Sequence, residues 1–152
     1  ATPVTKPKGG QFVLHAKALH GNPFDGHTLG PVIDGMTRLI GVEPRRVHVG
    51  KGHRGHNQPN RFRVWISGQA RCVTKAIRRE MKRRAAVEPV IGHVKAEHRM
   101  ARNCLKGRSG DRATAVLAAA GYNFSLLLRW QEALLRVLFR ALIARIAAPQ
   151  SP

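Results

Sequence analysis

The sequence predicts an α/β domain whose C-terminal half is helical. Residues 11–19 alternate between apolar and polar side chains, and residues 27–40 carry an apolar stripe at helical spacing. Two short β-branched segments follow, and helical patterns then fill residues 74–147. At 152 residues the chain is about one domain, long enough to bury a core.

One strand and one helix are expected first. Gln11–Leu19 has the two-residue period of a strand, with Phe12 among the apolar residues on one side. A turn cluster follows, in which Asp25 is placed to cap the next helix. That helix is expected over His27–Ile40, where Pro31 is tolerable only near the first turn and Gly41 supplies the stop.

Two short strands and a series of helices are expected next. The strands are Arg45–Val49 and Phe62–Ile66, with a Gly/His/Asn/Pro loop between them. The helices are expected over Thr74–Arg84, Glu88–Cys104, Arg112–Ala119 and Asn123–Ala147, with residues 107–110 as a loop. Pro89 biases Glu88 away from helical angles, so a new helix should begin there, and Asp111 should cap the one after it. Charged residues interrupt the last helix before it reaches the roughly 20 apolar residues of a membrane span, which favours an amphipathic docking helix.

Charge is the strongest compositional signal. The chain has 27 Lys and Arg against 8 Asp and Glu, a formal net charge of +19. This excess favours a polyanionic partner, either nucleic acid or an anionic membrane surface. Aromatic residues make up only 5%, so stacking of bases on an aromatic platform is not the expected binding mode. The candidates for a phosphate-tracking surface are Arg45, Arg46, Lys51, Arg54, Arg61, Arg63 and the basic residues of 71–84.

The two cysteines and the N-terminus indicate a cellular setting. Cys72 and Cys104 form neither a disulfide framework nor a zinc ribbon, which is typical of a reduced, cytoplasmic protein. Residues 1–10 lack the apolar core of a signal peptide and are expected to be a flexible end. The chain has no initiator Met, as expected of a processed chain or one cut from something longer.

The prediction of function depends mainly on the stretch from Arg84 to Lys95. It holds Glu88 in a region, residues 71–112, with thirteen Lys or Arg and only four acids. A lone carboxylate in so positive a field can hold a cation near phosphates. It can equally be a helix-start residue stabilised by the helix dipole and by Arg84.

Three residues separate Arg84 from Glu88, and six separate Glu88 from Lys95. This spacing resembles the motif around the last acid of bacterial insertion-sequence transposases with an Asp-Asp-Glu active site. Flanking blocks are similar to the insertion-sequence-five group: Gly21–Leu29, Lys51–His56, Trp65–Gln69, Leu105–Arg108 and Gly121–Phe124. Three places depart from that pattern. Met81 and His53 each stand where the family has Tyr, and Gly50 stands where it has the second metal-binding Asp.

The resemblance implies a partial RNase H-like fold, in which a mixed sheet is flanked by helices. Residues 11–112 would be the partial catalytic domain, and residues 113–152 would be C-terminal amphipathic helices packing on it. Relative to that fold the chain begins at the third strand, so the first two strands, and the first catalytic Asp with them, would be absent. The sheet would then expose a long edge.

The resemblance also implies cleavage and strand transfer of DNA at insertion-sequence ends, with Mg²⁺ held by three carboxylates. Glu88 matches the catalytic and metal-binding Glu, while Gly50 offers no side-chain oxygen. Arg84 and Lys95 match residues that contact DNA phosphates, and Arg99 is expected to continue their helix face. Lys51 and Arg54 complete the predicted DNA-binding residues.

With one acid of three, this chain is predicted not to cut DNA by itself. Asp25 lies in a turn block and Asp34 lies inside a helix, so neither is expected to replace the missing acid. The predicted function is a degenerate or truncated transposase that binds DNA in the bacterial nucleoid, as a homo-oligomer or in a mixed assembly with intact transposase. Alternatives are a non-catalytic nucleic-acid binder that interferes with intact transposase, and a ribosome-like RNA binder.

The residue spacing gives little support for two other kinds of site, a zinc site and a phosphate-binding loop. His53 and His56 lack the second pair of a zinc finger, and His93 with His98 lies one residue too far apart to share a helix face. In the loop over residues 50–55, Lys51 precedes the Gly residues, unlike a phosphate loop of the Walker type.

Overall fold

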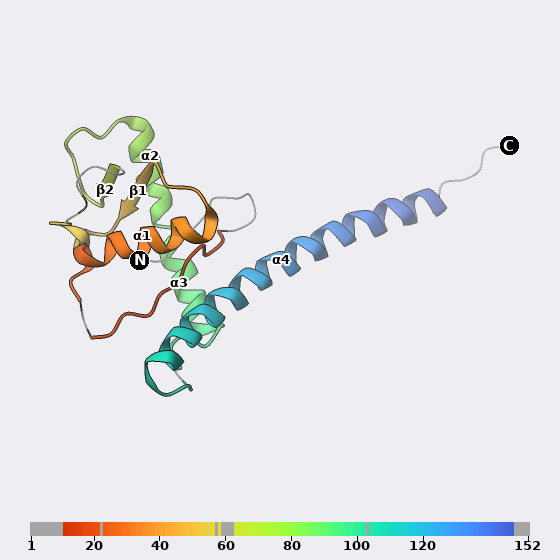
Figure 1. The fold of residues 1–152 in the computed structure, drawn as a ribbon. Coiled ribbons are helices and arrows are strands. Elements are labelled where there is room, and N and C mark those ends of the chain that lie inside the picture. The colour runs from red at the N-terminus through yellow and green to blue at the C-terminus, as the bar shows by residue number, and fades with distance from the viewer. Residues whose placement is uncertain (1–10, 22, 57, 59–62, 103, 148–152) are drawn as a thin grey trace.

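The computed structural model describes residues 11–21, 23–56, 58, 63–102 and 104–147 (Figure 1). Its elements are helix α1 (Asp25–Ile40), strand β1 (Arg46–Val49), the 3₁₀ turn η1 (Lys51–His53), strand β2 (Arg63–Ile66) and helices α2 (Lys75–Arg84), α3 (Val87–Ala96) and α4 (Gly107–Ala147). The α/β prediction is confirmed, and the chain is mostly helical.

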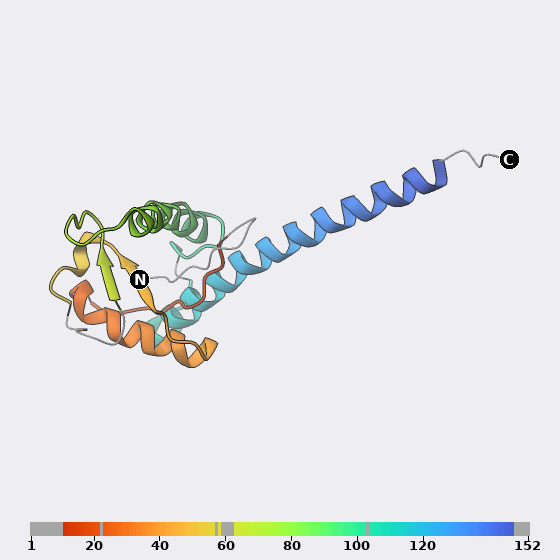
Figure 2. The same cartoon turned by 90° about the horizontal axis from the view of Figure 1, so that it is seen from above.

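The two strands lie between helices on both faces (Figure 2). β1 and β2 pair in parallel, with Val47 opposite Val64 and Val49 opposite Ile66. These four side chains face α1, where they pack with Leu29 and Ile33 in one of two core clusters. α2 covers the other face of the sheet. The two-residue period of the strands therefore produces a small three-layer arrangement.

The N-terminal segment is not the predicted strand. Of residues 11–19 only Val13 forms an isolated bridge. The Asn123 amide oxygen in α4 also accepts from the Val13 N–H at 2.9 Å, and its NH₂ donates to the Val13 carbonyl at 2.8 Å. This side chain therefore ties the extended segment to α4. Phe12 and Val13 are adjacent in the chain and both pack on α4, so the predicted alternation does not separate buried from exposed side chains here.

α1 begins two residues before its predicted start. Asp25 is its first residue and not its cap; Phe24 takes the cap position without a side-chain hydrogen bond. Pro31 consequently lies inside the helix, past the first turn where proline is best tolerated. The predicted stop is confirmed, because Gly41 has a φ of 71° and donates its N–H to the carbonyl of Thr37.

Helices α2 and α3 are separated by a tight turn at Ala85 and Ala86. Pro89 has no N–H for the carbonyl of Ala85, and the Glu88 N–H bonds that carbonyl in a shorter turn. α3 ends at Ala96, so the prediction that it reaches Cys104 is wrong. Arg99 has a left-handed φ of 57° and lies beyond the helix, not on its face.

α4 is one helix of 41 residues, where a loop, a cap at Asp111 and two helices were predicted. Gly121 lies inside it, and a Cβ there would come within 3.1 Å of His98 Nδ1. The glycine therefore allows a close approach of the chain that follows α3, and does not mark a turn. Ala118, Ala119, Tyr122 and Leu126 pack against Val90 and Val94 of α3 in the second core cluster.

Only the first half of α4 packs on the rest of the protein. Residues 131–147 are all exposed, including Leu134, Leu138 and Ile143 at 55–63%. Both views show this half projecting away from the other elements (Figures 1 and 2). In the described part of the chain, no helix is both long and apolar enough to cross a membrane. A domain boundary at residue 112 stays a prediction, and it would fall within α4.

Candidate nucleic-acid and metal site

The end of β1, the end of α2 and the start of α3 meet around Arg84. Its Nη2 atom lies 3.0 Å from the place that a Cβ on Gly50 would take. Its Nη1 atom lies 3.9 Å from Oε1 of Glu88, one helical turn further along the chain. The structure therefore brings Gly50, Arg84 and Glu88 together, with the guanidinium between the other two.

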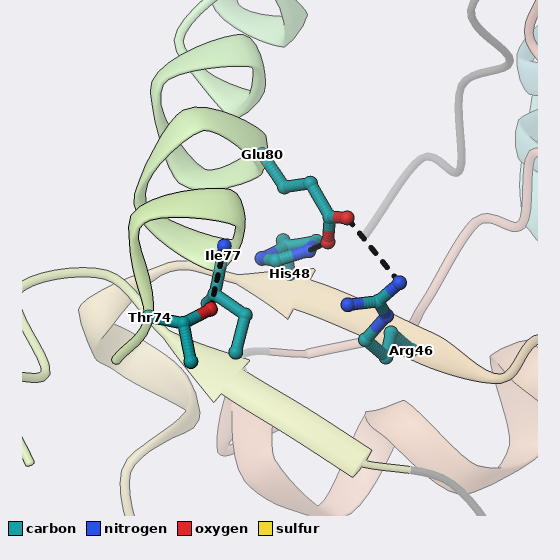
Figure 3. Close-up of polar contacts among 5 residues, drawn as sticks. All are labelled: Arg46, His48, Thr74, Ile77 and Glu80. Carbon is teal, nitrogen blue, oxygen red and sulfur yellow. Dashed lines mark hydrogen bonds and ion pairs between the residues drawn. The ribbon is translucent and has the colours of Figure 1, made fainter. Parts of the chain in front are cut away.

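A polar cluster on α2 fixes the position of this helix on β1 (Figure 3). Glu80 accepts from Arg46 Nη2 at 3.3 Å and lies 3.0 Å from His48 Nε2, both on the face of β1 opposite α1. At the start of α2, the Thr74 hydroxyl accepts from the N–H of Ile77, as an N-cap does. Sequence reasoning missed this role of Glu80, for which the only signal was that it is one of few acids in a basic region.

Gly50 is not required by the backbone at its position. Its φ of −73° and ψ of 170° lie in the extended region open to every L residue. The absence of a carboxylate at the end of β1 is therefore not enforced by the local conformation. What occupies the space is the side chain of Arg84.

The other predicted site residues lie at different distances from this point. Lys51 and Arg54 are exposed on and beside η1, which follows Gly50 directly. The Lys51 side chain runs over the turn after β2, with Cε 3.5 Å from where a Cβ on Gly68 would be. Lys95 is exposed on α3 two turns beyond Glu88, whereas Arg99 lies in the chain that follows the helix.

The residues present do not fit a Mg²⁺ ion. Among the described residues, no group of three or more His, Cys, Asp or Glu side chains could hold a metal ion. Mg²⁺ prefers several hard oxygen ligands, and here Glu88 has a guanidinium as its neighbour. Its side chain is 74% exposed.

Asp25 lies closer to this region than its place in a turn block suggested. Its carboxylate contacts Gly52 of η1, next to the buried His53. Burial lowers the pKa of His53 below the ordinary value of 6.5, and the nearby Asp25 carboxylate opposes that shift. Both ring nitrogens of His53 are buried and have no hydrogen-bond partner among the described residues. Burial of the ring in η1, beside Asp25 of α1, therefore favours neutral His53.

A second group of polar side chains lines a cavity of about 190 Å³ between α3 and α4. His93 forms a hydrogen bond with Glu97, and this bond holds the pKa of the Glu97 carboxyl below its ordinary value. His98 packs edge-on against Tyr122, whose pKa is raised by burial. The helical spacing of His93 and Glu97 predicts their contact. The approach of Tyr122 is a tertiary contact that no local signal predicts.

Comparison with known protein families identifies the family of this chain. The family model described as "Transposase DDE domain" matches residues 50–128, which is 79 of the 152 residues. No curated protein and no solved structure matches the chain. The matched region begins at Gly50 and contains Arg84, Glu88, all of α2 and α3 and the packed half of α4. The chain thus belongs to the transposase DDE domain family.

Proposed function

We propose that this protein binds DNA as a member of the insertion-sequence-five group of transposases and does not cleave DNA by itself. One observation carries the proposal: the guanidinium of Arg84 lies between Gly50 and Glu88, where the resemblance places two metal-binding carboxylates. A cation at this point favours a phosphate over Mg²⁺. Lys51, Arg54 and Lys95 are exposed and add to the positive charge.

The parallel pair of strands between helices is consistent with part of an RNase H-like fold. In that fold the end of β1 would carry the second Asp, and the start of α3 would carry the Glu. Magnesium then belongs to the family's chemistry and not to this chain. We place the protein in the bacterial cytoplasm, associated with the nucleoid, because its partner is DNA.

The proposal is tested by measuring DNA binding and cleavage on the same preparation. Fluorescence anisotropy with a labelled duplex of about 30 base pairs should show binding that weakens steeply between roughly 50 and 200 mM salt. A supercoiled plasmid incubated with the protein and Mg²⁺ or Mn²⁺ should stay intact. Absence of binding at the lowest salt would refute the DNA-binding part, and metal-dependent nicking would refute the non-catalytic part.

The exposed half of α4 favours a second candidate function, assembly with another transposase chain or with itself. The large apolar side chains on residues 131–147 are exposed in the described protein. Burying one such side chain at an interface is favourable by about 1.5–3 kcal/mol. Sedimentation equilibrium should therefore show self-association that Leu138→Lys with Leu142→Lys removes. A wild-type monomer at all concentrations would refute self-association.

A further inference from the structure

The two sides of α2 carry different chemistry. The side that faces the protein holds Ile77, Glu80 and Arg84, which contact the core, β1 and the Gly50 corner. The opposite side holds five cations, and all of them are exposed: Lys75, Arg78, Arg79, Lys82 and Arg83. Their spacing of three and four residues places them on one face of the helix.

Within the described part of the chain, these five cations have no acidic partner. No ion pair joins any of them to an acid among the residues that the structure describes, and the acid on α2, Glu80, is held by Arg46 and His48 on the other side. Three pairs, Lys75 with Arg79, Arg78 with Lys82 and Arg79 with Arg83, are like charges one turn apart. Such pairs destabilise a helix. Lys75 and Arg78 also lie near its N-terminus, where the helix dipole disfavours positive charge.

A row of cations that destabilises its own helix is expected where a partner of opposite charge binds to it. We propose that the outer face of α2 is the surface on which this protein holds the phosphate backbone of duplex DNA. The inference rests on the proposed function and locates its main contact, on residues that the motif around Glu88 does not include.

The dimensions agree with this assignment. The five cations span about 12 Å of helix, at 1.5 Å per residue. The same length of duplex DNA carries about seven phosphate charges. The face has no Asn or Gln, the side chains that pair with adenine edges. Phosphate contacts carry no sequence information, so binding through them should depend strongly on salt and little on sequence.

Two variants with equal net charge test the surface. The first replaces Arg78, Arg79, Lys82 and Arg83 by Gln, which has nearly the helix propensity of the residues that it replaces. The matched control makes the same change at Lys17, Arg38, Lys106 and Arg112, which are exposed outside α2 and outside residues 131–147. A third variant, Arg78→Lys with Arg79→Lys and Arg83→Lys, keeps the charge of α2. Circular dichroism and urea unfolding establish that each variant folds.

We expect the α2 variant to lose at least about tenfold in affinity for duplex DNA and about 2 to 4 units of the salt slope. The control should lose little of either, and the lysine variant should bind like the wild type. The urea midpoint of the α2 variant should change little, because removing the like-charge pairs offsets the loss of Lys82 and Arg83 from the last turn, where the helix dipole favours cations.

The competing results are distinct. If the wild type binds DNA and the α2 and control variants weaken equally, net charge alone explains binding and the inference is overturned while the proposed function stands. If the wild type binds no duplex DNA, both fail. If an RNA duplex of the same length displaces the DNA at a far lower concentration, the assignment to DNA is overturned.

Discussion

Replacing Gly50 by Asp tests whether Arg84 has taken over the place of the missing carboxylate. Two effects add. The backbone at Gly50 is open to any L residue, so Gly50→Ala should stabilise the fold by about 0.4–1 kcal/mol through the unfolded chain. The carboxylate of Gly50→Asp would further meet the guanidinium of Arg84, which is 29% exposed. A partly exposed ion pair adds about 0.5–1 kcal/mol.

Sterically the new side chain is tight but feasible. A Cβ would lie 3.0 Å from Arg84 Nη2, and this atom is at the end of a flexible side chain that can move by a few tenths of an ångström. Gly50→Asp should therefore be more stable than the wild type by about 1–2 kcal/mol in urea unfolding. Its advantage over Gly50→Ala should shrink in about 1 M salt and disappear below about pH 4, where the carboxyl is protonated.

The same variants test metal binding. In Gly50→Asp the carboxylate is engaged by Arg84, so Mg²⁺ should add no stability beyond a control of equal ionic strength. In Gly50→Asp with Arg84→Gln, two carboxylates are free, and Mg²⁺ at about ten times its Kd should add about 1.4 kcal/mol. The reasoning is refuted if Gly50→Asp is less stable than Gly50→Ala by more than about 1 kcal/mol. It is also refuted if the single variant alone gains Mg²⁺-dependent stability.

Three further predictions concern the fold. Leu126 is 4% exposed, so Leu126→Ala should lower the free energy of unfolding by about 2–4 kcal/mol. Leu138 lies on the same helix but is 55% exposed, so Leu138→Ala should change it by less than about 0.5 kcal/mol. Equal losses in urea unfolding would show that the second half of α4 is packed. Asn123→Ala should cost about 2 kcal/mol, since it removes both hydrogen bonds to Val13, and unchanged amide exchange at Val13 would contradict that pairing. The folded state disfavours protonated His53, so the free energy of unfolding should fall as the pH drops below 6.5. His53→Gln should therefore make the urea midpoint less dependent on pH between about 5 and 7.5.

Local sequence signals located the elements of the first half well. The apolar stripe of α1 and the alternation in β1 and β2 are each encoded within a few residues, so period suffices to find them. The helix predicted over Thr74–Arg84 is α2, with Thr74 as its cap and not its first residue. The N-terminal segment failed because alternation indicates a half-buried extended chain but not what pairs with it. In this protein the segment is bound by a side chain of α4, Asn123, 110 residues away.

Helix ends in the second half were decided by packing. No Gly or Pro follows Ala96, yet α3 ends there, where Met100 turns onto the core and His98 packs on Tyr122. Gly121 and Asp111 carry local signals for a break or a cap, yet α4 runs through both. Propensities of this size, about 1 kcal/mol, are outweighed by the burial of several apolar side chains against a neighbouring helix.

By itself the sequence determined the charge of +19, the family and the lack of a carboxylate at position 50, because these depend on which residues are present and in what order. Only the tertiary structure decided where Arg84 points, that the cations of α2 face solvent together, and that half of α4 has no partner in the described chain. The physical reason is that a side chain's neighbours across space follow from how helices and strands pack, and this packing is set by contacts far apart in the chain.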